Sequence, residues 1–217
     1  MMLSPRKIAG IVFDMDGTLL DSLPVQLESY RLAIVGSGGR DRSHAEILDS
    51  FGLGSASVML ERLIGRPVGA VASARYLAHL RDNAAGVAPY PGIAGALRDL
   101  SSSVPLGVFT AADTDAAEIL LSVTGLRSSF DVVVGADLVA RTKPAPDGLI
   151  TACAALGVQP SETAYVGDGP FDMAAARACG AVGVAAGWGH QFALDREADM
   201  VVATPADLRR ALLLPAG

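Results

Sequence analysis

The stretch GIVFDMDGTLLDS, residues 10–22, decides the fold of this chain. With the three residues before it, its apolar lead-in predicts a strand over residues 7–14, of the kind that a parallel sheet covers on both faces. The strand ends in Asp14, and Asp16 and Asp21 follow closely. Carboxylates grouped at the end of a buried strand repel one another and lose hydration. Such an unfavourable arrangement points to a function at this strand end.

Strand and helix signals alternate from residue 87 onwards. This alternation predicts right-handed βαβ units. The expected fold is therefore α/β, with a doubly wound, parallel, Rossmann-like sheet covered by helices on both faces. The expected strands after the first are residues 104–110, 130–137, 163–168, 181–187 and 198–203. The expected helices are residues 91–103, 113–125, 145–157, 171–180 and 205–214.

The segment between the first strand and this alternating part has a different pattern. Residues 22–86 contain several helical patterns ended by glycine and no convincing strand. We therefore expect a small all-helical cap domain over 22–86, inserted after the first strand. The catalytic α/β core domain would then consist of residues 1–21 and 87–217.

Composition limits the partners and the compartment. The chain has 217 residues, a net charge of −6 and a pI near 5.0, so neither nucleic acid nor an anionic membrane would attract it electrostatically. It contains no uncharged apolar run long enough to span a bilayer. Two cysteines without a CxxC or Cys/His cluster argue against a structural zinc site and fit a reducing compartment. We expect a cytoplasmic monomer or homodimer.

Polar side chains follow several of the predicted strands. In open α/β sheets, ligands bind beyond the carboxyl ends of the strands. The side chains expected to converge there belong to Asp14, Asp16, Thr110, Lys143 and Asp168, with Asp172 four residues further on. Only one other lysine, Lys7, occurs in the chain, which makes Lys143 conspicuous.

These side chains suit phosphoryl chemistry. In an extended chain Asp14 and Asp16 face the same side, and with Asp168 they would form a hard oxygen cluster suited to Mg²⁺. A carboxylate can also attack phosphorus and form an aspartyl-phosphate. Thr110 can donate a hydrogen bond to a phosphoryl oxygen, and Lys143 can neutralise charge that develops there.

Glycine has a further role beside this cluster. Gly17 would let backbone N–H groups after the second acid approach a phosphate closely.

The pattern resembles the haloacid dehalogenase superfamily of phosphatases, in its form with a helical cap and close to its phosphoglycolate phosphatase-like and β-phosphoglucomutase-like subgroup. FDMDGTLLDS, residues 13–22, is similar to the family's first motif. Thr110 corresponds to the second motif and Lys143-Pro144 to the third. VGDGPFDMAAARACG, residues 166–180, corresponds to the fourth. The four follow the family's order, and the resemblance covers residues 8 to 212.

The resemblance implies a role for each matched residue. Asp14 would be the nucleophile and a Mg²⁺ ligand. Asp16 would be the general acid and then the general base, and would bind the metal through its carbonyl. Thr110 and Lys143 would bind the transferring phosphoryl group. Asp168 would complete the metal site.

Three neighbouring positions have less definite roles. Asp172 would support the metal ligands or the lysine from outside, or would begin its helix, where an acid is favourable. Ala111 occupies a substrate-binding position where the family often has Asn or Ser. Gly169 stands where a polar residue is common. One hydrogen bond to the substrate or the metal shell is therefore absent or supplied elsewhere.

Several functions compete. The leading one is a Mg²⁺-dependent phosphatase that acts on a small phosphorylated metabolite. A hexose-phosphate phosphomutase of the same superfamily shares the whole core and stays open. A non-hydrolytic phospho-receiver would use similar side chains, but the long helical insert argues against it. A catalytically silent binding protein is disfavoured because every core catalytic position is present. The acid at position 16 argues against dehalogenation, and the absence of lysine from residues 23–86 argues against phosphonatase chemistry.

Substrate identity depends on the cap. Seven arginines lie between residues 22 and 86, and arginine is suited to carboxylate and phosphate recognition. The expected substrate is a phosphoglycolate-like acid or a sugar phosphate. The three histidines, His44, His79 and His190, are interpreted as surface or packing residues.

Overall fold

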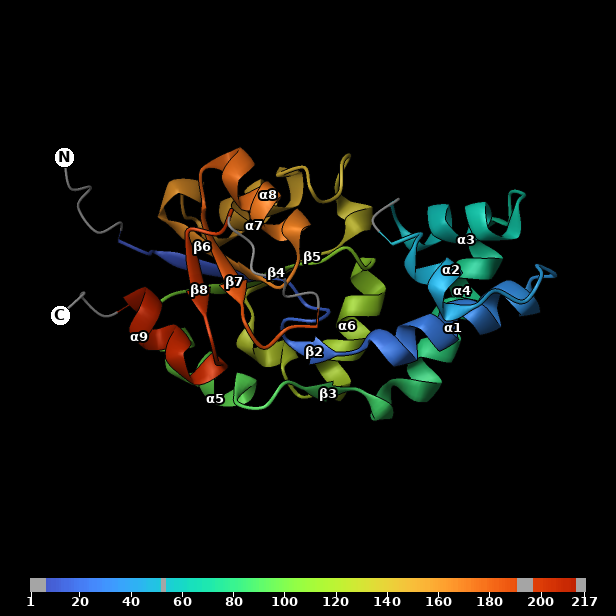
Figure 1. The fold of residues 1–217 in the computed structure, drawn as a ribbon, viewed down its shortest axis with the longest axis horizontal. Helices are drawn as coiled ribbons and strands as arrows, with labels where there is room; N and C mark the ends of the chain where they lie inside the picture. The colour runs from blue at the N-terminus through green and yellow to red at the C-terminus, as the bar shows by residue number, and fades with distance from the viewer. Residues whose placement is uncertain (1–6, 52–53, 191–196, 214–217) are drawn as a thin grey trace.

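The computed structural model describes residues 7–51, 54–190 and 197–213. Its larger part is a parallel sheet of six strands in the order β5-β4-β1-β6-β7-β8. The predicted α/β fold with a parallel sheet is confirmed (Figure 1). The strands are β1 (Gly10–Phe13), β4 (Leu106–Phe109), β5 (Val132–Val134), β6 (Thr163–Gly167), β7 (Val182–Ala186) and β8 (Met200–Val202).

Strand β1 lies in the middle of the sheet because its whole sequence is apolar or glycine. All four residues are buried, and β4 and β6 flank the strand on its two edges. The strand is shorter than the predicted range 7–14. The hydrogen-bond ladder nevertheless continues one residue further, since the Asp14 amide donates to the Val166 carbonyl at 2.8 Å. This bond fixes the backbone of the first acid.

Helices cover both faces of the sheet, as predicted. α7 and α8 pack on one face through the cluster that contains Val12, Phe109 and Tyr165. α5, α6 and α9 lie on the opposite side (Figure 1). These helices are α5 (Ile93–Ser101), α6 (Thr114–Val123), α7 (Asp147–Leu156), α8 (Pro170–Cys179) and α9 (Leu208–Leu213). Short 3₁₀ helices are η1 (Ala84–Gly86), η2 (Arg127–Ser129), η3 (Ala136–Leu138), η4 (Pro160–Glu162) and η5 (Pro205–Asp207).

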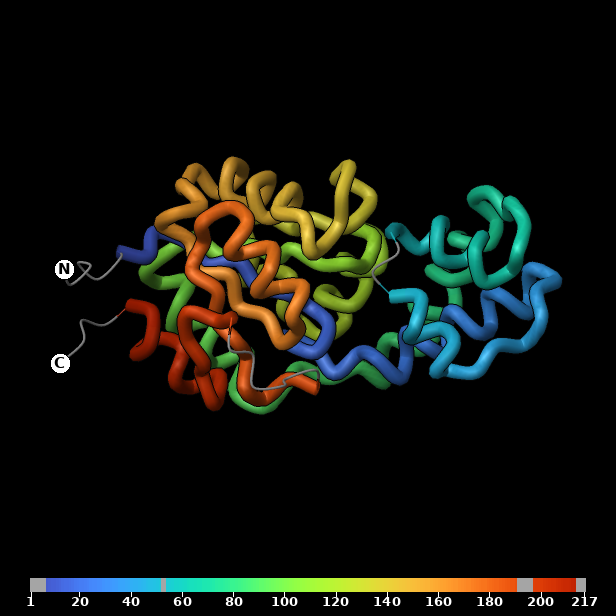
Figure 2. The backbone as a smooth tube through the Cα atoms, turned by 45° about the horizontal axis from the view of Figure 1, so that its top comes forward, coloured from blue at the N-terminus to red at the C-terminus, as the bar shows by residue number. Residues whose placement is uncertain are grey.

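Four helices form a separate layer beyond one end of the sheet (Figure 2). They pack mainly on one another through stacked aromatic rings, with the Tyr30 and Tyr76 centroids 4.2 Å apart. Residues 22–51 and 54–86, the described part of this segment, contain no strand, and the domain boundaries stay a prediction. The helices are α1 (Leu23–Gly36), α2 (His44–Leu48), α3 (Ala56–Ile64) and α4 (Gly69–Asn83).

A two-stranded antiparallel ribbon joins this layer to the sheet. β2 (Leu20–Asp21) carries the chain out, and β3 (Ala88–Pro89) brings it back. The sequence did not predict this ribbon, since two residues are too few to show a period-2 pattern. Among the helices in the described ranges, none combines the length and apolar character needed to cross a bilayer.

Candidate active site

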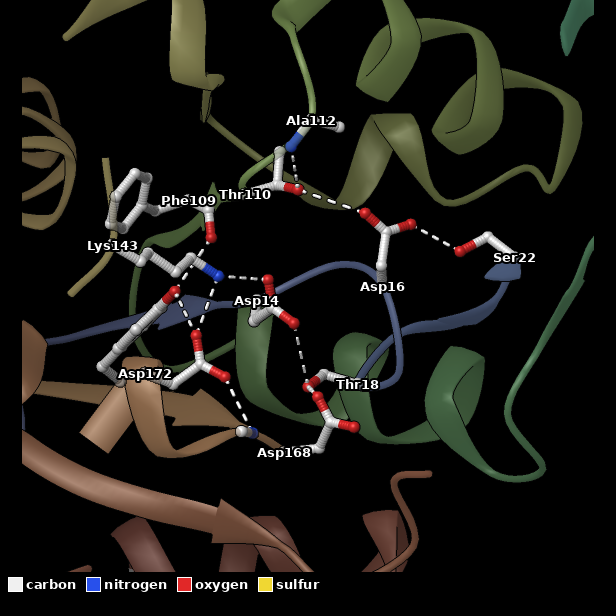
Figure 3. A network of polar contacts seen from close by, with 12 residues as sticks. Asp14, Asp16, Thr18, Ser22, Phe109, Thr110, Ala112, Lys143, Asp168 and Asp172 are labelled. Carbon is white, nitrogen blue, oxygen red and sulfur yellow. Dashed lines mark hydrogen bonds and ion pairs between the residues drawn. The ribbon is translucent and has the colours of Figure 1, made fainter. Parts of the chain in front are cut away.

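The predicted side chains meet at the carboxyl edge of the sheet (Figure 3). Asp14 follows β1, Thr110 follows β4, and Asp168 follows β6. Lys143 comes from the loop after β5, and Asp172 lies in the first turn of α8. All five are buried. The parallel topology therefore brings together residues that are up to 158 positions apart in sequence.

Three of the acids form a compact oxygen cluster. Asp14, Asp168 and Asp172 each offer one carboxylate oxygen, and these oxygens lie within 4.8 Å of one another. The Thr18 hydroxyl lies 3.4 Å from a carboxylate oxygen of Asp14 and the same distance from one of Asp168. Hard oxygen donors at this spacing suit a small divalent cation.

The carboxylate of Asp16 does not belong to this cluster, contrary to the geometry predicted from an extended chain. The chain turns directly after β1, and Gly17 adopts a left-handed backbone with φ +88°. Asp16 therefore points toward other partners (Figure 3), accepting hydrogen bonds from Ser22 and Gln26, and from Thr110 at 3.4 Å. The predicted metal contact through its main-chain carbonyl stays a prediction.

Lys143 is the cation at the centre of the site. Its ammonium group pairs with Asp14 and, at 2.8 Å, with Asp172. It lies 5.3 Å from the ring centroid of Phe109 and 5.5 Å from that of Tyr165. Burial alone would lower the pKa of Lys143, but the two carboxylates outweigh it and raise the pKa above its usual value. The lysine therefore stays charged.

The first two acids have raised pKa values. Burial raises the pKa of Asp14 well above its ordinary value; Lys143 opposes this effect, and the neighbouring carboxylates of Asp172, Asp168 and Asp16 add to it. Burial also raises the pKa of Asp16, against the lowering effect of its hydrogen bond from Ser22. A carboxyl group that holds its proton more tightly is suited to general acid catalysis near neutral pH.

Known proteins are similar to this chain in sequence. The sequence profile of the haloacid dehalogenase-like hydrolases matches residues 11–186. A phosphoglycolate phosphatase of Chromobacterium violaceum is 34% identical, covering 94% of this chain and 96% of its own. The fructose-1-phosphate phosphatase YqaB of Escherichia coli is 31% identical, covering 81% of this chain and 94% of its own. The chain belongs to the haloacid dehalogenase-like hydrolases.

Solved structures of this family share the fold. The crystal structure of CbbY from Rhodobacter sphaeroides in complex with phosphate superimposes with a TM-score of 0.77 at 21% identity. The match covers 93% of this hydrolase and 96% of that chain. At this identity the likeness supports the arrangement of strands and helices.

Asp172 both contacts Lys143 and begins helix α8, the two roles that the sequence left open. One carboxylate oxygen accepts from Lys143 and, at 3.1 Å, from the Tyr165 hydroxyl. The other accepts from the Gly169 amide at 3.0 Å and so caps α8. One side chain thereby positions Lys143 and caps the helix.

Two predicted phosphate contacts are engaged elsewhere in this structure. The Gly17 amide donates to the Leu20 carbonyl at 2.9 Å, and the predicted close approach of this backbone to a phosphate stays a prediction. The geometric reason for this glycine is space, since a Cβ there would lie 2.4 Å from an oxygen of Asp168. Thr110 is fully buried, and its hydroxyl donates to Asp16. A phosphate contact from Thr110 requires its hydroxyl to change partner.

A cavity of about 500 Å³ opens over the cluster. Ala111 and Gly169 line it, and the substrate-binding role of Ala111 stays a prediction. His190 lines it too, with Nδ1 3.7 Å from Asp168 and 3.4 Å from the Tyr90 hydroxyl. This histidine is exposed, as its interpretation as a surface residue expects, but the sequence did not indicate that it would lie at the cavity.

Sequence reasoning missed the residues that hold Asp16 and the turn of the acidic motif in place. Ser22 is the N-cap residue of α1, but its hydroxyl donates to Asp16 and makes no side-chain cap. Gln26, one helical turn later, donates to the same carboxylate. The sequence did contain a signal for these contacts, because two polar residues, Ser22 and Gln26, stand at the start of the helix that follows the acidic motif. The indole of Trp188 donates to the Thr18 carbonyl at 2.8 Å and secures the motif's turn.

Proposed function

We propose that this hydrolase is a Mg²⁺-dependent phosphatase that cleaves small phosphate monoesters through an aspartyl-phosphate on Asp14. The observation that carries the proposal is a buried carboxylate facing a cavity, paired with one lysine and surrounded by further acids. The names of the curated relatives support phosphate ester hydrolysis. We further propose that residues 22–86 form the cap that covers the site.

The residues present fit a Mg²⁺ ion. Three buried carboxylates, those of Asp14, Asp168 and Asp172, lie close together around a single lysine, so the acids of the cluster outnumber its cation. Asp14 and Asp168 would hold the ion together with the carbonyl of Asp16, while Asp172 stays on the lysine. A bound Mg²⁺ would offset the charge of the acids and of the phosphoryl group.

The reaction then has two displacements at phosphorus. In the first, a carboxylate oxygen of Asp14 attacks, and the bond from phosphorus to the alcohol oxygen breaks. Asp16 gives its proton to that departing oxygen. Lys143 stabilises the charge on the equatorial oxygens. In the second, Asp16 takes a proton from water, and the water oxygen attacks phosphorus. The bond between phosphorus and the Asp14 oxygen breaks, which releases inorganic phosphate and restores the Asp14 carboxylate.

A generic assay tests the proposal. Purified protein with Mg²⁺ is expected to release phosphate from 4-nitrophenyl phosphate, and brief incubation followed by hydroxylamine is expected to convert Asp14 to a hydroxamate detectable by mass spectrometry. Absence of turnover contradicts the proposal. The same protein given a hexose phosphate and a bisphosphate primer should yield free phosphate; an isomerised sugar phosphate would instead indicate a mutase.

Asp16→Asn is expected to slow hydrolysis of an alkyl phosphate by about 10²–10⁴-fold, the usual range for a lost general acid. With 4-nitrophenyl phosphate, the rate of the first displacement should fall less than with the alkyl ester, because 4-nitrophenolate leaves without needing a proton. Burst kinetics separate the two displacements. Asp21→Asn is the matched control, since Asp21 is the exposed third acid of the same motif. Equal losses in the two variants would argue against the assigned role.

Mg²⁺ is expected to raise the thermal unfolding temperature in the absence of substrate. At a concentration 100 times its Kd the ion would add about 2.7 kcal/mol to the free energy of unfolding. Asp168→Asn should remove most of this gain, because it removes one carboxylate of the cluster. Calorimetry with Mg²⁺ and with EDTA measures the effect. A Mg²⁺-induced shift that Asp168→Asn leaves intact would place the ion elsewhere.

A further inference from the structure

The cavity over Asp14 has two chemically different walls. The sheet side presents the acids, Lys143 and His190. The opposite side is built from helices α1 to α3 and the residues between them, and it is apolar and aromatic: Leu23, Tyr30, Leu48, Phe51 and Met59. Two of these rings pack together, with the Tyr30 and Phe51 centroids 5.9 Å apart.

No arginine among the described residues lines this cavity. All seven arginines between residues 22 and 86 lie in the described ranges, and five of them bind other groups. Arg31 pairs with Glu28 and Asp41, for example, and Arg42 donates to the Leu63 carbonyl. Arg40 pairs with Glu46, Arg66 donates to the Ser37 carbonyl, and Arg75 donates to the Gly36 carbonyl. The remaining two, Arg62 and Arg81, are exposed.

The polar groups at this apolar side are already used. The side-chain amide of Gln26 donates to Asp16 and lies 3.3 Å from the Ser22 hydroxyl. Lys143, on the other wall, serves two carboxylates. A carboxylate on the leaving group would therefore reach the helical wall without a described cation to meet it. Moving an unpaired charge against apolar side chains is strongly unfavourable.

We infer that the leaving alcohol of the preferred substrate is uncharged and presents an apolar face to Leu48, Phe51 and Met59. This inference rests on the proposed phosphatase function and narrows its substrate class. Of the two classes that the sequence left open, it favours an uncharged alcohol over a phosphoglycolate-like acid. The phosphoryl group stays at the sheet edge, where Lys143 lies.

Two aryl phosphates of nearly equal shape test the inference without any mutation. 4-Carbamoylphenyl phosphate has a neutral leaving group, and 4-carboxyphenyl phosphate adds one negative charge at the same position. We expect kcat/KM to be at least tenfold higher for the neutral ester, with the difference mainly in KM. Equal values, or a preference for the carboxylate, would overturn the inference. Failure to hydrolyse 4-nitrophenyl phosphate as well would instead overturn the proposed function.

Leu48→Arg tests whether the helical wall sets this preference. Leu48 lines the cavity yet is 39% exposed, so the larger side chain can be accommodated. In the variant, the ratio of kcat/KM for the neutral ester to kcat/KM for the charged ester should fall by fivefold or more. Val71→Arg is the matched control, because Val71 is exposed on α4 and does not line the cavity. If the two variants change this ratio equally, the helical wall does not discriminate between charged and neutral leaving groups.

Discussion

Asp14→Asn is expected to reduce phosphate release by at least about 10⁴-fold, whichever ester is supplied. An amide is a poor nucleophile toward phosphorus, and residues that act as one catalytic unit lose most of their effect together. The substitution keeps the shape of the side chain. Steady-state rates with 4-nitrophenyl phosphate, and loss of the hydroxylamine-trapped adduct, measure the effect. Asp14→Ala serves as a second variant that deamidation cannot restore.

The same variant should not be less stable than the wild type when Mg²⁺ is absent. Burial and neighbouring carboxylates raise the pKa of Asp14, so its ionised form opposes folding. The folded state then binds more protons than the unfolded state, and this contribution to stability falls as pH rises above the ordinary value of 3.8 toward the raised pKa. The advantage of Asp14→Asn should grow across that window. Full activity in Asp14→Asn, or clear destabilisation in EDTA, would contradict this account of the site.

Lys143→Met is expected to cost both activity and stability. Phosphate release should fall by about 10²–10³-fold, the usual effect of removing one electrostatic donor to a transition state. Removing one partner of a buried ion pair typically costs about 3–5 kcal/mol, and here both Asp14 and Asp172 lose their partner. Denaturant unfolding without Mg²⁺ measures the loss. Methionine keeps much of the side-chain length beside the rings of Phe109 and Tyr165.

The chain supplies a matched control for this experiment. Lys7 is the only other lysine in the sequence, and it is exposed. Lys7→Met should leave activity and stability unchanged, since exposed charges contribute little. Lys143→Arg should restore part of the stability but little activity, because the planar guanidinium is bulkier than an ammonium group in a buried position. If Lys143→Met is as stable as Lys7→Met, the buried pairs do not hold the site together.

The sheet could be predicted from the sequence because each buried strand is a short apolar run between helical patterns. The ends of β1, β4 and β6 were near enough to their predicted positions to identify the residues that meet at the sheet edge. The ribbon of β2 and β3 could not be predicted, since its pairing depends on the chain returning after the helices.

Prediction of the site was less complete for a geometric reason. Residue spacing indicates which strand ends carry acids, but not how the chain turns beyond them. Asp16 leaves the oxygen cluster because Gly17 reverses the backbone, and Asp172 lies where three oxygens converge. His190 reaches the cavity through a loop that has no periodic pattern. The directions of the arginine side chains between residues 22 and 86 depend on tertiary packing, which a count of arginines does not reveal.

The central position of β1 has a consequence for how the protein emerges from the ribosome. This strand is made first, yet its neighbours are Leu106 on one edge and Thr163 on the other. During vectorial synthesis this apolar strand stays unpaired on both edges until β4 has been made, and on its second edge until β6 has followed. The helices α1 to α4 can form from local contacts meanwhile, whereas strand pairing across such sequence distances is slow and exposed to aggregation. We therefore expect nascent chains that stop before β6 to depend on chaperones, and the yield of soluble protein to rise once residue 167 has been released.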